Sequence, residues 1–349
     1  MPWPQSESDG GRCATSHGRL GVPCVVRADR IGDRVPVFAS GRVHSVFEHA
    51  CNIETRTGEL VTLLAQDLGN VPHGIRLAGP VAPFEPWLIP GQNAILDKVA
   101  LRVSDAGMTV DLSGAAVWRG GVAAVAIDHR NATRAVALRE LRTTLYECAP
   151  AQGFAPLLAA PASTRSSVDR AVAARLSHTL PLLARATEQR DVTAVAAAAA
   201  RLVGLGPGLT PSGDDFIVGY LAALWSRAGH ENGIDAMLHS LADSLAPLFL
   251  RTNAISRQML SDAAQGRFAE RLIDVTGAVA GTGDVVDATA NALASGHSSG
   301  ADTLCGLLFG YAPDMAMLAA PSSPHRPPGQ PHLRAARLER RAGRAAALA

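Results

Sequence analysis

Short apolar runs alternate with turn residues over the first 150 residues. These runs are rich in β-branched residues, and examples are residues 22–26, 35–38, 42–47, 60–64 and 122–127. They are separated by Gly41, Gly58, Gly69, Gly79 and Gly91. Several short strands with regular turn signals are typical of a small antiparallel barrel or sandwich. Because only residues 135–148 have a helical pattern here, we expect a β-rich domain over residues 18–150.

After residue 150 the hydrophobic period becomes helical. Apolar positions recur every three or four residues over 168–183 and 234–248, and residues 194–200 form an alanine-rich run that favours helix. The pattern predicts seven or eight helices between residues 165 and 312, packed closely through small side chains. We therefore expect an α+β protein with a helical bundle over residues 151–315.

The two ends of the chain have a different composition. Residues 1–17 are polar, and residues 316–349 contain several prolines and six arginines against the single acidic residue Glu339. A charge run of this kind is usually solvated. We expect both ends to be disordered.

Composition excludes several classes of protein. Of the 349 residues 47% are hydrophobic and the formal net charge is +1, which excludes a disordered chain and gives no indication of a nucleic-acid partner. Five widely spaced cysteines exclude a disulfide-rich scaffold. Neither a signal peptide nor an apolar stretch long enough to cross a bilayer is present, so we expect a cytoplasmic protein without a membrane partner.

The most informative segment is the glycine loop, residues 204–215, with the sequence GLGPGLTPSGDD. It lies between two predicted helices, and glycine permits close approach of another group. The first backbone N–H groups of the second helix are expected to be unpaired and able to hold a phosphate or carboxylate. The candidate anion-binding residues are Gly206, Gly208, Thr210, Ser212 and Gly213.

Two adjacent carboxylates, Asp214 and Asp215, end the glycine loop. They are candidates for acid–base catalysis on an amide, or for binding Mg²⁺ or another divalent cation through oxygen. No lysine follows the glycines, as a Walker loop requires, and a helix rather than a strand precedes them, which excludes a dinucleotide fingerprint. No established cofactor motif is present, so the cofactor stays undefined apart from this cation.

A second segment, residues 296–302 (GHSSGAD), repeats the pattern Ser-Gly-x-Asp before another apolar helix. The two helix starts could face one pocket. His297 is a candidate for proton transfer, because the ordinary pKa of histidine is near neutral. Asp302 is a third candidate metal ligand beside Asp214 and Asp215. The remaining candidate binding residues of this segment are Ser298, Ser299, Gly300 and Asp302.

A polar stretch, residues 252–256 (TNAIS), lies between these two segments. Thr252 and Ser256 are four residues apart and would share one face of a helix. Next to a polar pocket, Thr252, Asn253 and Ser256 would contact a ligand.

These segments together resemble the AllH-like family of oxamate carbamoyltransferase subunits. The matching pieces are GLGPGLTPSGDDFIVGYLAAL (204–224), TNAISRQMLSDAAQG (252–266), GHSSGADTLCGLLFG (296–310) and HSVFEHACNI (44–53). The resemblance covers residues 20–312. It implies a role in anaerobic allantoin breakdown, in which family members act with two partner subunits. Together these convert oxalurate and phosphate into oxamate and carbamoyl phosphate.

Three hypotheses follow for the function. The first is a subunit of a carbamoyltransferase that binds small anions at the helix starts. The second is a metal-assisted amidohydrolase in which the three aspartates hold Mg²⁺ or Mn²⁺. The third is a non-catalytic ligand-binding or scaffold subunit.

Overall fold

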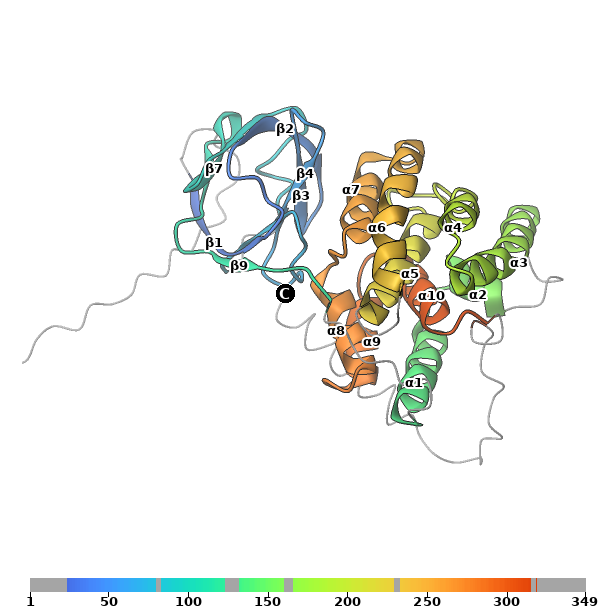
Figure 1. The fold of residues 1–349 in the computed structure, drawn as a ribbon. Helices are drawn as coiled ribbons and strands as arrows, with labels where there is room; N and C mark the ends of the chain where they lie inside the picture. The colour runs from blue at the N-terminus through green and yellow to red at the C-terminus, as the bar shows by residue number, and fades with distance from the viewer. Residues whose placement is uncertain are drawn as a thin grey trace, which may run out of the picture.

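The computed structural model describes residues 24–79, 83–122, 132–159, 166–228, 233–314 and 318. Two hydrophobic cores divide them. One core draws its buried side chains from residues 28–112 and is built of strands, and the other draws them from residues 137–318 and is built of helices. Figure 1 shows the strands curled into a barrel that lies beside the helical region. The α+β architecture expected from the sequence is therefore confirmed.

Nine strands build the β region within the described residues. They are β1 (Cys24–Gly32), β2 (Ala39–Val46), β3 (Ala50–Thr55), β4 (Leu60–Leu64), β5 (Gly74–Leu77), β6 (Asn93–Leu96), β7 (Ala100–Val103), β8 (Met108–Asp111) and β9 (Ala116–Trp118). The sheet runs in the order β5-β4-β3-β2-β6-β7-β8-β1-β9, and a further pairing of β5 with β1 closes it. Eight strands thus form the barrel, and β9 is an extra strand beside β1.

The barrel is not wholly antiparallel, so that part of the prediction is wrong. Strand β4 pairs with β5 in parallel, and β1 pairs in parallel with both β8 and β9. The long strand β1 changes partner along its length. Its first half pairs with β8, whereas beyond Ala28 it pairs with β5 across an irregular register. Strand β1 thus has β8 on one side and β5 on the other, and the pairing with β5 closes the barrel.

Ten α-helices lie in the described residues of the C-terminal part. They are α1 (Ala132–Cys148), α2 (Phe154–Ala159), α3 (Ser167–Glu188), α4 (Val192–Ala199), α5 (Ser212–Arg227), α6 (Ile234–Leu245), α7 (Ala254–Ala264), α8 (Glu270–Val279), α9 (Val285–Leu293) and α10 (Ser299–Tyr311). A 3₁₀ segment, η3 (Ala246–Arg251), joins α6 to the residues before α7. A shorter one, η1 (Ser104–Ala106), lies between β7 and β8.

The sequence pattern located the helices better than the strands. Eight α-helices lie between residues 167 and 311, as expected, and α1 occupies the expected helical stretch at 135–148. The run at 60–64 is β4, and the runs at 22–26 and 42–47 overlap β1 and β2. Residues 35–38, by contrast, form a bent, irregular connection between β1 and β2. Most of the run at 122–127 lies outside the described residues.

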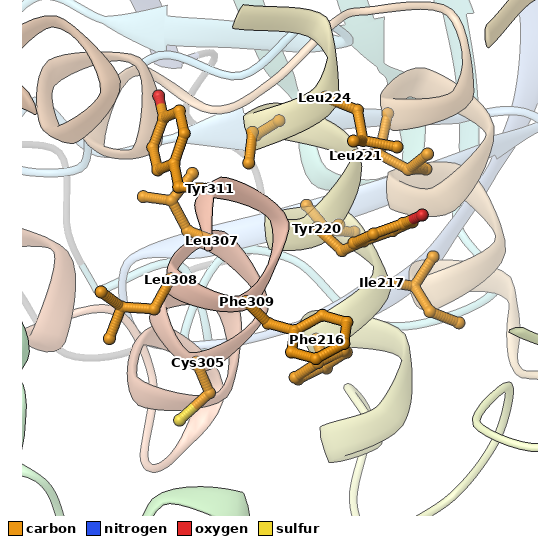
Figure 2. Close-up of a cluster of buried hydrophobic side chains, with 14 of the residues drawn as sticks. Phe216, Ile217, Tyr220, Leu221, Leu224, Cys305, Leu307, Leu308, Phe309 and Tyr311 are labelled. Atoms are coloured by element: carbon orange, nitrogen blue, oxygen red, sulfur yellow. The ribbon is translucent and has the colours of Figure 1, made fainter. Parts of the chain in front are cut away.

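The two helices that follow the Ser-Gly-x-Asp segments, α5 and α10, cross at very close range. A Cβ atom added to Gly219 of α5 would lie 1.8 Å from the Thr303 carbonyl oxygen, and one added to Gly306 of α10 would lie 1.9 Å from the Phe216 carbonyl oxygen. Only glycine allows the two backbones to approach this closely. Aromatic and aliphatic side chains of both helices, including Phe216 and Phe309, fill the core around the crossing (Figure 2).

Polar contacts join the barrel to the end of α7 and the start of α8. Arg267 Nε lies 3.2 Å from Asp33 Oδ2, and Asn70 N–H donates to Glu270 Oε2 over 2.8 Å. The Phe268 N–H donates to the Gly120 carbonyl over 2.7 Å. The corner over residues 258–271 therefore fixes the barrel to the helical region. None of the helices described is long and apolar enough to cross a membrane.

Candidate functional site

The starts of α5 and α10 meet in a reciprocal arrangement. The Ser212 hydroxyl at the start of α5 lies against the Asp302 carboxyl of α10, and the Ser299 hydroxyl at the start of α10 lies against the Asp215 carboxyl of α5. The two Ser-Gly-x-Asp segments thus face one another, which is the arrangement that their shared sequence pattern left open.

Glycine explains why both helices can begin so close to their neighbours. A Cβ atom on Gly213 would lie 2.0 Å from the Leu202 carbonyl oxygen, and one on Gly300 would lie 2.1 Å from the Ala292 carbonyl oxygen. Gly213 and Gly300 occupy equivalent positions of the two segments. The candidate binding residues Gly213 and Gly300 are therefore packing positions with no free side.

Asp214 is fully hydrogen-bonded and binds the loop together. The Gly204 N–H donates to Asp214 Oδ1 over 2.7 Å, and the Thr252 hydroxyl donates to Asp214 Oδ2 over 2.5 Å. Asp214 is also buried. Its carboxylate therefore fixes the start of the glycine loop and the residue before α7 relative to α5.

Asp215, the next residue, lies in the opposite situation. Its side chain is buried, with 1% of the residue exposed, and neither carboxyl oxygen has a hydrogen bond of standard geometry to a described residue. Burial raises the pKa of this carboxyl well above its ordinary value. The nearby Ser299 and Thr210 hydroxyls lower the pKa, whereas Asp302 and Asp214 raise it further. A neutral carboxyl is therefore favoured here.

Asp302 is buried as deeply but has one strong partner. The Phe154 N–H donates to Asp302 Oδ1 over 2.6 Å, while Oδ2 has no partner among the described residues. Burial raises the pKa of Asp302 to about 6, against the lowering effect of the Phe154 N–H and the Ser212 and Ser298 hydroxyls. This carboxyl is mostly ionised at neutral pH.

Sequence reasoning missed the segment that holds Asp302. Gly153 has a φ of +89°, and a Cβ atom there would lie 2.5 Å from Asp302 Oδ1. The glycine therefore lets the backbone pass over the carboxylate and present the Phe154 N–H to it. The only local signal is a single glycine in the sequence QGF, about 50 residues before the glycine loop.

The glycine loop leaves a run of unused backbone donors. Within the described structure, no hydrogen bond is made by the N–H groups of Gly206, Gly208, Leu209, Thr210 and Ser212. The expectation of unpaired donors is wrong further along, because the Gly213 N–H donates to the Leu205 carbonyl and the N–H groups of Asp214 and Asp215 donate to the Pro211 carbonyl. Pro211 is also the N-cap of α5, and its ring has no group that can accept a hydrogen bond from the helix start. The candidate anion donors are therefore in the loop.

The polar stretch 252–256 lies against the glycine loop. Thr252 precedes α7 instead of sharing a helical face with Ser256, because α7 begins at Ala254. The Asn253 side chain is the N-cap of α7 and accepts from the N–H groups of Ile255 and Ser256. The Ser256 hydroxyl donates to the Leu209 carbonyl over 3.4 Å. These residues thus position the loop.

The candidate for proton transfer, His297, lies at the surface. His297 is exposed and makes no hydrogen bond within the described part of the chain.

Among the described residues, no group of three or more His, Cys, Asp or Glu side chains is close enough to hold a metal ion. Asp214, Asp215 and Asp302 therefore do not form such a group.

A second buried polar cluster joins the barrel to α7, and no sequence motif indicates it. His73 Nδ1 lies 3.1 Å from Asp262 Oδ2 and 3.1 Å from Gln258 Nε2. The Leu60 N–H donates to Gln258 Oε1 over 3.1 Å. The cluster consists of residues about 190 positions apart, so no local motif could indicate it.

Two family models match the chain over the two regions described above. The model for the oxamate carbamoyltransferase subunit AllH matches residues 202–311, and the model for the AllH family N-terminal domain matches residues 26–117. The chain belongs to the AllH family. The AllH match contains both Ser-Gly-x-Asp segments and the stretch 252–256. The site at the starts of α5 and α10 therefore lies inside the match, except for residues 153–154. No solved structure matches the chain. The family name supports a role as a subunit.

Proposed function

We propose that this AllH family member is a subunit of an oxamate carbamoyltransferase. The reaction transfers a carbamoyl group from oxalurate to phosphate, giving carbamoyl phosphate and oxamate, in the cytoplasmic breakdown of allantoin and other purine products. The subunit acts with partner subunits in a hetero-oligomer, needs neither nucleic acid nor membrane, and contributes the site between α5 and α10.

One observation carries the proposal: within the described residues, the loop with unused N–H donors lies against carboxyl oxygens that have no hydrogen bond of standard geometry. The loop N–H groups of residues 206–212 are suited to an anion, and the positive end of the α5 dipole adds to them. Asp215 and Asp302 are suited to the opposite partner, an amide nitrogen with N–H groups to donate. Oxalurate has both features, because its oxalyl end is anionic and its ureido end carries amide hydrogens.

The site residues have different roles in this proposal. The N–H groups of Gly206, Gly208, Thr210 and Ser212 hold the substrate carboxylate or the phosphate. Residues Asp214, Thr252, Asn253 and Ser256 position the loop through the contacts described above. Residues Ser298 and Ser299 orient the second helix start. Electrostatic positioning of this kind supplies most of the rate in transfer to phosphate.

Direct assay of the reaction tests the proposal. The purified full chain is incubated with oxalurate and phosphate, alone and with candidate partner subunits, and carbamoyl phosphate is measured. We expect product only when the partner subunits are present. Absence of product in every combination would overturn the proposal. A Mg²⁺ or Mn²⁺ titration in the same assay tests for a divalent ion, which the substrate phosphate could bring to the site.

A further inference from the structure

The two buried carboxyls of the site are unequal. Asp302 accepts a short hydrogen bond of 2.6 Å from the Phe154 N–H, which favours its ionised form. Asp215 has no such donor on either oxygen among the described residues, and it is 1% exposed. Two carboxyls in different environments are the usual basis for dividing acid and base roles between them.

Among the residues that the structure describes, no cation acts on either carboxyl of the pair. The charged groups that act on Asp215 are Asp302 from α10 and Asp214 from its own helix, and both are acidic. The groups that act on Asp302 are hydroxyls and the Phe154 N–H. Cys305, one turn further along α10, is buried and its thiol pKa is raised by burial and by Asp302, so it adds no charge. Two negative charges here would be unscreened, and one proton relieves the repulsion.

We propose that Asp215 is the general acid of the site and holds the proton that the departing amide nitrogen takes up, while Asp302, anchored by Phe154, stays ionised and orients the ureido N–H groups. The assignment rests on the proposed function for the identity of the leaving group. It rests on the structure for the inequality of the two carboxyls.

Oxalurate and phosphate supply every atom of the two products. An oxygen of the phosphate dianion attacks the carbamoyl carbon, and the bond between this carbon and the oxamate nitrogen breaks. The nitrogen takes the Asp215 proton and leaves as the neutral amide of oxamate. The carbamoyl phosphate formed still carries the original phosphate proton, which passes to the Asp215 carboxylate. The acid is thus restored without any further proton donor.

Infrared spectroscopy of the full chain in the absence of substrate tests whether Asp215 carries a proton. At pH 7 we expect the wild type to show the C=O stretching band of a protonated carboxyl. This band should be absent from Asp215→Asn and retained in Asp214→Asn. Identical wild-type and Asp215→Asn spectra in this region would overturn the proposal.

A second variant covers the case in which Asp215→Asn does not fold. In Asp302→Asn the band should remain and should titrate at lower pH than in the wild type, because a neighbouring negative charge has been removed. A titration midpoint that does not move would contradict the pairing of the two carboxyls.

Kinetics separate this assignment from the proposed function. With the partner subunits present, Asp215→Asn should lower kcat about 100-fold or more with little change in KM. The matched control, Asp243→Asn on the exposed face of α6, should be unchanged. Carbamoyl transfer with normal kcat in Asp215→Asn would overturn the acid role and leave the function standing. The C=O band of a protonated Asp215 without any carbamoyl transfer would support the proton on Asp215 and overturn the proposed function.

Discussion

At the scale of single residues, neighbours in the sequence have opposite surroundings. Asp214 and Asp215 are adjacent and both buried, yet Asp214 has two donors and Asp215 has none of standard geometry among the described residues. The sequence indicates that both aspartates matter, because they follow a glycine loop. It cannot indicate how they differ, since the donors come from residues 10 and 38 positions away.

This difference predicts opposite effects of the same substitution on stability. Asp214→Asn places an NH₂ group where one of two donors now points, and it should lower the free energy of unfolding by about 1–3 kcal/mol. Asp215→Asn replaces a carboxyl whose neutral form is favoured by burial, and it should leave stability unchanged or raise it. Denaturant unfolding at pH 7 measures both. Equal losses in the two variants would contradict the assigned environments.

The raised pKa of Asp302 predicts a pH dependence of stability. The folded-state pKa, about 6, is higher than the ordinary value of 3.8. Between these values the folded state holds a proton that the unfolded state has lost, so stability falls as pH rises from about 4 to about 6 and is constant above. The difference in unfolding free energy between wild type and Asp302→Asn should therefore fall by about 3 kcal/mol over this range. A difference that is independent of pH would refute the shift.

At the scale of elements, the site depends on how closely α5 and α10 cross. The sequence predicted both helices and the similarity of their starts, because the pattern is local. It missed the short strands β5–β9, which have too few residues to show an alternating pattern. It also could not predict the parallel pairings of β1, which depend on strands far away in the chain.

The glycine crossing predicts a strong effect of one methyl group. Gly219→Ala or Gly306→Ala would place a Cβ within 2 Å of a carbonyl oxygen of the other helix. Each should cost about 1–3 kcal/mol or more, because the helices must separate. Thermal unfolding measures the loss. Gly114→Ala is the matched control, since nothing lies within 4 Å of its added Cβ, and it should change stability by less than about 0.5 kcal/mol. A similar result for all three variants would mean that the crossing is not tight.

At the scale of the whole molecule, α7 links the two regions. Its first residues contact the glycine loop, and its last turn contacts the barrel through Asp262 and His73. In Figure 1, α7 lies on the side of the helical region that faces the barrel. Neither contact could be predicted from the sequence, because each joins segments distant in the chain.

Loosening this link should separate the barrel from the helices. Asp262→Ala leaves His73 and Gln258 without their carboxylate partner at a buried position, which costs about 1–3 kcal/mol. In calorimetry we expect the single unfolding transition of the wild type to broaden or split in the variant. Asp243→Ala, on the exposed face of α6, serves as the reference. A sharp, unshifted transition in Asp262→Ala would show that the cluster does not hold the regions together.

The deep burial of the two carboxyls has a consequence for the affinity of the site. Asp215 is 1% exposed and Asp302 is 0% exposed, so under the proposed function a substrate would reach them only after the loops packed over them moved aside. Substrate binding would then include an opening step. The apparent affinity for substrate is the intrinsic affinity reduced by the fraction of molecules that are open. A partner subunit that holds the loops open would raise this fraction, and it would tighten substrate binding without touching the substrate.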